Sequence, residues 1–221
     1  MNYDSVPLRD FKELNDWETV IFVYQSALKQ VETKIDILNG EFQHRHKYNP
    51  IEHVKSRIKT PESIVKKLKR HGYESSIENM VRYVNDIAGI RISCSFTSDI
   101  YLIADMISKQ NDLTILARRD YMKNPKKSGY RSYHMLVTTP VFLSDSIIDT
   151  KVEIQIRTVA QDFWATLEHK MHYKFEGDGP DYITKELREC ARYVAELDTR
   201  MEELNNEIQK YGKLSLSLIH I

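Results

Sequence analysis

The chain has 221 residues, of which 41% are hydrophobic and 29% are charged, and its 32 basic side chains balance its 32 acidic ones. This length fits one domain with appended helices better than two independent cores, and the neutral charge indicates no particular partner. No apolar run approaches the roughly 18 residues that a membrane span needs, and the N-terminus lacks the pattern of a signal peptide. The two cysteines lie far apart, so we expect no disulfide framework, no zinc site and a cytosolic protein.

Apolar residues in alternating steps of three and four predict a long helix at each end of the chain. One such seam begins at Trp17 and the other at Ile183. Seams of this length pack on the middle of the chain or on copies of themselves, and we expect a homo-oligomer, with purely intramolecular packing as the alternative. The expected segments are a helix over 12–46, a core over 47–175 and a helix over 180–211.

The middle of the chain alternates helix and strand signals. Thr60 and Pro61 predict the start of one helix and Gly72 its end, while Gly89 closes the next helix. Alternating apolar and polar residues predict strands. Helices are expected over 60–72, 75–89, 97–110 and 159–175, and strands over 90–96, 113–121, 133–143 and 151–158. This order indicates an α+β fold in which helices flank a mixed β-sheet.

Two acidic residues accompany the predicted strands that have one polar face. Glu153 lies on the polar face of one strand, and Asp86 lies shortly before another. Two carboxylates on neighbouring elements can hold Mg²⁺, which prefers oxygen ligands and pairs with substrate phosphates. Basic residues gather in two clusters, 55–71 and 118–131, where they can neutralise phosphates. Together these features predict phosphoryl transfer, although each cluster alone is also typical of a solvated surface.

The segment KNPKKSGYRSYH, residues 123–134, has the composition of a nucleotide-binding loop. Gly129 lets the backbone come close to a ligand, and the ring of Tyr130 can stack on a base. Lys126 and His134 can meet phosphates. Neither GxGxxG nor GxxxxGK[ST] occurs in the chain, so Rossmann and P-loop nucleotide sites are excluded by motif.

Four segments together resemble the synthetase domain of the RelA/SpoT homologues, and most closely the stand-alone small alarmone synthetases of the RelP type. The resemblance covers roughly residues 12–210, and it implies a nucleotidyltransferase-like sheet. It also implies transfer of pyrophosphate from ATP to the 3′-hydroxyl of GDP or GTP, which gives ppGpp or pppGpp and AMP. The segments are HVKSRIKTPESIVKKLKR, DIAGIRI, RRDYMKNPKKSGYRSYH and VEIQIRTVAQDFWATLEHKMHYK.

The resemblance further implies a role for each residue that matches the family's motifs. Asp86 and Glu153 match the acids that bind Mg²⁺, and Glu153 also matches the general base for the 3′-hydroxyl. Among the residues implied to bind nucleotides, Arg57 and Arg91 match the pair that sandwiches adenine, and Tyr130 matches the residue that stacks on guanine. The residues implied to bind ATP are Arg57, Lys59, Ser63, Lys67, Arg70 and Arg91. Those implied to bind GDP or GTP are Arg119, Lys126, Tyr130, His134, Gln155 and Asp162.

The chain has no His-Asp dipeptide and no room for the hydrolase and regulatory domains of the bifunctional members, so the resemblance implies synthesis of alarmone without its degradation. It also implies a homotetramer. Two other interpretations stay open. One is a toxin-like pyrophosphokinase that acts on adenosine nucleotides or on a tRNA 3′ end, and the other is a non-catalytic module that binds nucleotides or RNA.

The last six residues, LSLIHI at 216–221, break both the apolar seam and the charge pattern. They equal the in-frame translation of a sequencing adapter. We therefore hypothesise that this tail is not native and that the synthetase domain spans 1–215.

Overall fold

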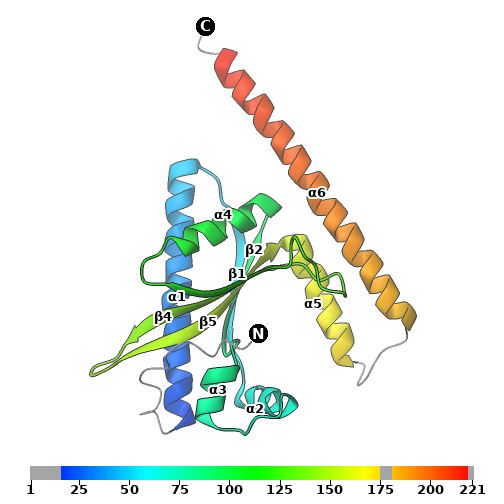
Figure 1. Cartoon of the computed structure of the whole chain (residues 1–221). Coiled ribbons are helices and arrows are strands. Elements are labelled where there is room, and N and C mark those ends of the chain that lie inside the picture. Colours follow the sequence, from blue (N-terminus) through cyan, green and yellow to red (C-terminus); the bar gives the residue numbers. More distant parts are fainter. Residues whose placement is uncertain (1–15, 175–180, 219–221) are drawn as a thin grey trace.

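The computed structural model describes residues 16–174 and 181–218, and side chains over 16–171 and 181–210. Within these residues the strands form one mixed sheet in the order β1-β2-β5-β4-β3. β2 and β5 run parallel, and the other neighbouring pairs run antiparallel. The elements in chain order (Figure 1) are α1 (Trp17–His46), β1 (Ile51–Ile58), α2 (Pro61–Arg70), α3 (Ile77–Tyr83), β2 (Ala88–Cys94), α4 (Thr97–Ser108), β3 (Thr114–Asp120), β4 (Tyr133–Phe142), β5 (Ile147–Thr158), α5 (Val159–Lys174) and α6 (Asp181–Leu218).

One face of the sheet is apolar and belongs to the hydrophobic core. Ile90 of β2 pairs with Ile154 of β5, which pairs with Met135 of β4, and all three side chains are buried. They form one cluster with the buried residues of α1 and α4. Full burial of such a side chain contributes about 1.5–3 kcal/mol. Since side chains alternate along a strand, the neighbouring residues of the same strands point to the opposite face, where the candidate site lies.

Helix α1 packs on the sheet of its own chain. The carboxylate of Asp16 caps its start by accepting a hydrogen bond of 2.7 Å from the backbone N–H of Thr19. The predicted seam contributes four of its buried residues, and the rest of the buried face comes from Val20, Val23 and Ala27. The seam of the N-terminal helix is therefore used within the chain. The expected residues 12–15 of this helix lie outside the described residues. The buried residues of α1 that belong to the predicted seam are Tyr24, Leu28, Val31 and Ile35.

Two differences from the sequence prediction concern β1 and α3. No strand was predicted over 51–58, because most of this segment is polar and only Ile51 is buried. The segment is an edge strand, so only its pairing with β2 fixes it in the sheet. The helix predicted over 75–89 ends already at Tyr83, because the residues from Ala88 onward join the sheet between β1 and β5.

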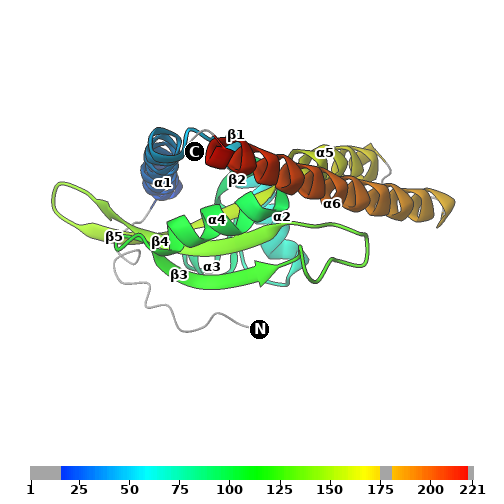
Figure 2. The same ribbon diagram turned by 90° about the horizontal axis from the view of Figure 1, so that it is seen from above.

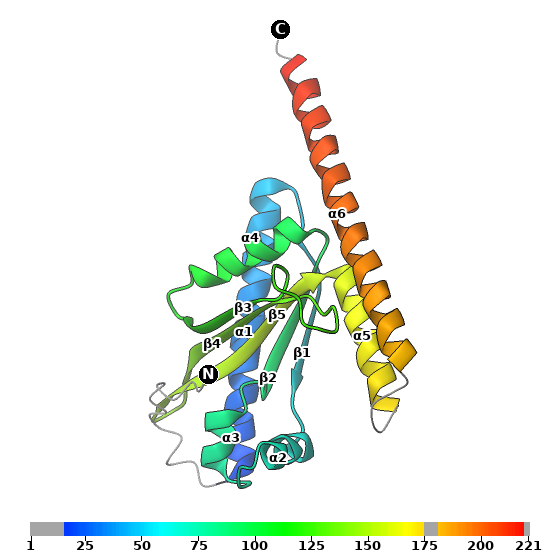
Figure 3. The same cartoon turned by 45° about the vertical axis from the view of Figure 1, so that its right-hand side comes forward.

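Helices α5 and α6 lie side by side at one end of the sheet, and the turn between β4 and β5 lies at the other end (Figure 2). The indole N–H of Trp164 in α5 donates a hydrogen bond of 3.0 Å to the carbonyl of Leu187 in α6. The distal half of α6 extends beyond the sheet (Figure 3). Its backbone is helical to Leu218, and residues 219–221 lie outside the described residues, so the hypothesis of a non-native tail stays a prediction. None of the described helices is both long and apolar enough to cross a bilayer.

Candidate active site

On the polar face of the sheet, the candidate site residues of β2, β4 and β5 lie side by side in one continuous row. In the parallel pair, Glu153 lies opposite Gly89 and Gln155 lies opposite Arg91. In the antiparallel pair, Gln155 also lies opposite His134 of β4. Side chains on this face are separated from the core only by the thickness of the sheet, so a row of polar groups is held on a rigid support.

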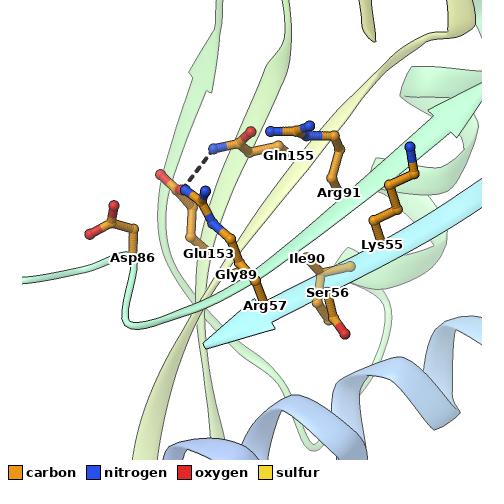
Figure 4. A pocket seen from close by; sticks show the side chains of 9 residues that line it. All are labelled: Lys55, Ser56, Arg57, Asp86, Gly89, Ile90, Arg91, Glu153 and Gln155. Atoms are coloured by element: carbon orange, nitrogen blue, oxygen red, sulfur yellow. Dashed lines mark hydrogen bonds between the residues drawn. The ribbon is translucent and has the colours of Figure 1, made fainter. Parts of the chain in front are cut away.

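Three cavities open on this face, and Glu153 lines all of them. The arginine hollow, of about 210 Å³, is lined by Arg57, Arg91 and Asp86 among others (Figure 4). The tyrosine cleft, of about 550 Å³, adds Tyr130 and several residues of α5. The histidine hollow, of about 70 Å³, is lined by Arg119, His134 and Asn85. Because the cavities share Glu153, two ligands in neighbouring cavities would meet at this carboxylate.

Asp86 lies in the turn between α3 and β2, and two lysines hold it. Its carboxylate oxygens are 2.8 Å from Nζ of Lys59 and 2.7 Å from Nζ of Lys67. Burial acts to raise the pKa of Asp86, but the hydrogen bonds from the two lysines outweigh it and lower this pKa below its ordinary value. Asp86 is therefore ionised, and it lines the arginine hollow while paired with both lysines.

Glu153 is held in place by its neighbours on the polar face. Gln155 donates a hydrogen bond of 2.8 Å to one carboxylate oxygen, and Nδ1 of His134 lies 3.6 Å from the other. Burial and the charge of Asp86 act to raise the pKa of Glu153, but His134 and Gln155 outweigh them and lower it. The result is a half-buried, ionised carboxylate at the junction of the three cavities.

Tyr130 is fixed through both its hydroxyl and its ring. The hydroxyl lies 2.8 Å from Nε2 of His134 and accepts a hydrogen bond of 3.1 Å from the guanidinium of Arg157. The ammonium of Lys126 lies 4.6 Å from the ring centre, and the guanidinium of Arg157 lies 5.3 Å from it. Gly129, with φ +92°, supplies the left-handed backbone of the turn before the tyrosine.

Residues 56–178 match the family model described as the region found in RelA / SpoT proteins. The chain belongs to the RelA/SpoT family. GTP pyrophosphokinase YwaC of Bacillus subtilis is 45% identical over 195 residues, which cover 88% of this chain and 93% of YwaC. The crystal structure of small alarmone synthetase 2 from Bacillus subtilis is 44% identical, with a TM-score of 0.80 and coverage of 87% of this chain and 99% of that one. Small alarmone synthetase 1 from the same species, solved with its product pppGpp, is 34% identical with a TM-score of 0.81, and the match covers 87% of this chain and 98% of that one.

These similarities confirm the expected α+β fold with long N- and C-terminal helices. Most of the expected site residues line one of the three cavities or contact one that does. Those that line a cavity are Arg57, Asp86, Arg91, Arg119, Lys126, Tyr130, His134, Glu153 and Gln155.

Five residues expected from the family's motifs line none of these cavities. Two of them are Lys59 and Lys67, which contact Asp86. Ser63 and Arg70 lie on the exposed surface of α2, on the same helical face as Lys67. Asp162, expected near guanosine, lies in α5 with its Oδ1 3.4 Å from a guanidinium nitrogen of Arg91 and 3.5 Å from one of Arg157. Its contacts support the two arginines.

Arg157 is a site residue that sequence reasoning did not select. Its side chain is 2% exposed and lines the tyrosine cleft, and one of its nitrogens donates a hydrogen bond of 2.6 Å to the side-chain oxygen of Gln155. It therefore links Gln155, Asp162 and the hydroxyl of Tyr130. The signal was present, because the alternation of β5 places residue 157 on the same face as Glu153.

Lys151, two positions before Glu153, is a second residue near the site that was not predicted from the sequence. It is buried, and its ammonium donates to the carbonyl of Arg82 at 3.1 Å and to the side-chain oxygen of Asn85 at 2.9 Å. Burial lowers the pKa of Lys151 to about 8. Lys151 ties β5 to the turn that carries Asp86, so it fixes one acidic residue relative to the other.

Asp86 and Glu153 are the acidic groups in this site that suit a divalent cation. The described residues contain no cluster of three or more side chains that could hold a metal by themselves. Two carboxylates that face one cavity and repel each other electrostatically fit Mg²⁺, which takes its remaining oxygen ligands from substrate phosphates and water.

Proposed function

We propose that this protein is a GTP pyrophosphokinase, a small alarmone synthetase that transfers pyrophosphate from ATP to the 3′-hydroxyl of GDP or GTP. The products are ppGpp or pppGpp, and AMP. The observation that carries the proposal is the position of Glu153, an ionised carboxylate shared by three cavities. The relative solved with pppGpp supports the same assignment, since its fold matches this chain.

Each cavity suits one part of the two substrates. The arginine hollow offers Arg57 and Arg91 as flat cationic groups between which adenine can stack. The tyrosine cleft offers Tyr130 as a stacking surface for guanine. The remaining cations suit phosphates: Lys59, Ser63, Lys67 and Arg70 for ATP, and Arg119, Lys126 and His134 for the acceptor, with Gln155 and Asp162 near the guanosine.

In the proposed reaction, Glu153 accepts the proton of the acceptor's 3′-hydroxyl as that oxygen attacks the β-phosphorus of ATP. The bond from this phosphorus to the oxygen that bridges it to the α-phosphate breaks, and AMP leaves with that oxygen. A hydroxyl is a weak nucleophile, so a carboxylate positioned beside it is needed. Mg²⁺, held by Asp86 and Glu153, would neutralise charge on the transferred group. Most of the rate enhancement then comes from orientation and charge neutralisation by the cations on this face.

We further propose a cytosolic homo-oligomer, a homotetramer as the family resemblance implies. In α6 beyond Val194, Leu197, Met201, Leu204 and Ile208 repeat at steps of four, three and four, and all four are exposed. An apolar stripe at this spacing is typical of a helix that packs against another helix. A second copy of the chain is the partner that this proposal assigns to the stripe.

A product assay tests the proposed reaction. Purified protein is incubated with Mg²⁺, γ-labelled ATP and, in separate reactions, GDP, GTP, ADP or deacylated tRNA. We expect label on GDP or GTP, with an equal amount of AMP. Label on ADP or tRNA would overturn the acceptor assignment but keep pyrophosphoryl transfer, and the absence of any transfer would support a binding module.

A further inference from the structure

Helix α6 touches the loop that presents Tyr130, although the two are about 60 residues apart in the sequence. The contact is between Gly129 and Ala191, which is 3% exposed. A Cβ atom built on Gly129 would lie 2.5 Å from the Cβ of Ala191. This is far closer than two carbon atoms can approach, so there is room for no further atom between the loop and the helix.

The ring of Tyr130 belongs to a small hydrophobic cluster that is separate from the main core. Trp164 and Ala165 of α5 and Ala191 of α6 form its buried part, and Tyr130 and Val194 pack against them. The hydrogen bond from the indole of Trp164 to α6 joins the two helices at this point. The face of the ring that is left for a base is therefore set by where α5 and α6 lie.

The position of α6 is in turn fixed to the end of the catalytic strand. Asp198 accepts hydrogen bonds of 2.9 Å from the hydroxyl of Thr158, the last residue of β5, and 2.9 Å from the amide of Gln161. One turn further along, Glu202 accepts a hydrogen bond of 3.1 Å from the backbone N–H of Ser98 at the start of α4. These bonds hold α6 against the same strand that carries Glu153.

We propose that α6 positions the acceptor nucleotide, and that Ala191 is the positioning residue through which it does so. In this arrangement the small side chain at 191 sets how closely the loop approaches the helix. The loop then sets where the ring of Tyr130 lies relative to Glu153. A larger side chain at 191 pushes the loop outward, tilts the ring and weakens guanosine nucleotide binding, while the arginine hollow for ATP is untouched. The inference rests on the proposed function.

Ala191→Val tests the contact, and Ala195→Val is its matched control one helical turn away. Ala195 is only partly buried and lies beside the same loop without touching Gly129 closely. For Ala191→Val we expect the KM for GDP or GTP to rise about tenfold, because the larger side chain displaces the loop that carries Tyr130, with the KM for ATP unchanged. Equal changes in both KM values, or an equal effect of Ala195→Val, would overturn the inference.

A rescue experiment separates this contact from general damage to the helix. Gly129→Ala introduces the clash from the loop side, and it also strains a backbone with φ +92°. Ala191→Gly removes the Cβ atom that the new methyl group meets. We expect the double variant to recover part of the acceptor affinity that Gly129→Ala loses. If the double variant lost as much acceptor affinity as the two single variants together, the proposed contact would be contradicted.

Calorimetric titration of GDP without ATP distinguishes failure of this inference from failure of the proposed function. A wild-type protein that binds GDP but forms no alarmone would overturn the proposed reaction alone. The inference would still require Ala191→Val to bind GDP more weakly than Ala195→Val does. Identical GDP affinities in the two variants would overturn the inference even if the wild-type protein makes alarmone.

Discussion

Glu153 and His134 lie side by side on neighbouring strands, with Oε1 of the glutamate 3.6 Å from Nδ1 of the histidine. The second ring nitrogen of His134 meets the hydroxyl of Tyr130 at 2.8 Å. The residue proposed as the base is thus connected, through one imidazole, to the residue proposed to hold guanine. A substitution at either Glu153 or Tyr130 should therefore change the binding or the reaction of the acceptor substrate.

Glu153→Gln keeps the shape of the side chain but removes the carboxylate. We expect alarmone synthesis to fall by at least about 100-fold, because a positioned general base contributes about 10²–10⁴-fold. AMP formation in the presence of GDP measures the loss, and the circular dichroism spectrum checks that the fold is intact. Turnover within a few-fold of the wild type would remove Glu153 from the mechanism.

Tyr130→Ala and Tyr130→Phe separate the ring from the hydroxyl. Loss of the ring should raise the KM for GDP or GTP about ten- to a hundred-fold, since stacking on one base is worth that much, and it should leave the KM for ATP nearly unchanged. Tyr130→Phe keeps the ring but loses the bonds to His134 and Arg157, so its defect should be smaller. If both substrates lost affinity equally in Tyr130→Ala, the stacking role would be wrong.

Asp86→Asn should shift the metal dependence of the reaction. An amide is a weaker ligand for Mg²⁺ than a carboxylate, so the Mg²⁺ concentration that gives half-maximal activity should rise about tenfold or more. A titration of activity with Mg²⁺ measures this, and excess EDTA should stop the wild-type reaction. Unchanged Mg²⁺ dependence in the variant would mean that Asp86 serves mainly as the partner of Lys59 and Lys67.

Asp198→Asn should change how stability depends on pH. Burial raises the pKa of Asp198 above its ordinary value of 3.8, so the native carboxyl group holds its proton more tightly than the unfolded one. The contribution of this group to stability is therefore greatest at low pH, and it falls as the pH rises from 3.8 through the raised pKa. The asparagine variant lacks this fall. Relative to the wild type, its free energy of unfolding should increase between about pH 4 and pH 7.

Urea unfolding of both proteins across this pH range measures the difference. A difference that stays constant with pH would show that Asp198 does not titrate differently in the folded and unfolded chains.

Leu204→Glu and Ile208→Glu test the apolar stripe of α6. If a second copy covers the stripe, a charge on it should lower the molar mass measured by light scattering by at least twofold. A glutamate at the exposed Asn206, between the two positions, is the control and should leave the mass unchanged. An unchanged mass in the stripe variants would mean that the chain associates elsewhere or is monomeric.

Local sequence signals predicted the parts of this fold that depend on few residues. Thr60, Pro61 and Gly72 bound α2 where capping preferences place its ends. The strict alternation of β5 predicted which of its side chains face the core. Because that alternation aligns with β2, it also brings Glu153 near Asp86 on one face.

Features that depend on distant partners could not be predicted in this way. The segment 51–58 is polar enough to be a loop, and it becomes a strand only because the edge of β2 is available. The burial of Arg157 and Lys151 depends on what covers them, which is α5 and Tyr130 for one and the turn after α3 for the other. The apolar seam predicted for α6 is one continuous stripe, yet its proximal part packs against α5 and the loop that carries Tyr130, while its distal part is exposed.

The alternation in β5 also disfavours a misfolded arrangement of the proposed site. A shift of one residue in the pairing of β5 would place Glu153 and Gln155 in the hydrophobic core and expose Ile154 and Ile156 to solvent. Such an arrangement would bury a carboxylate without a partner, and the free energy that this costs is large compared with the free energy of unfolding of a typical domain. Selection for a stable fold therefore also favours the register that places Glu153, the proposed base, on the polar face of the sheet.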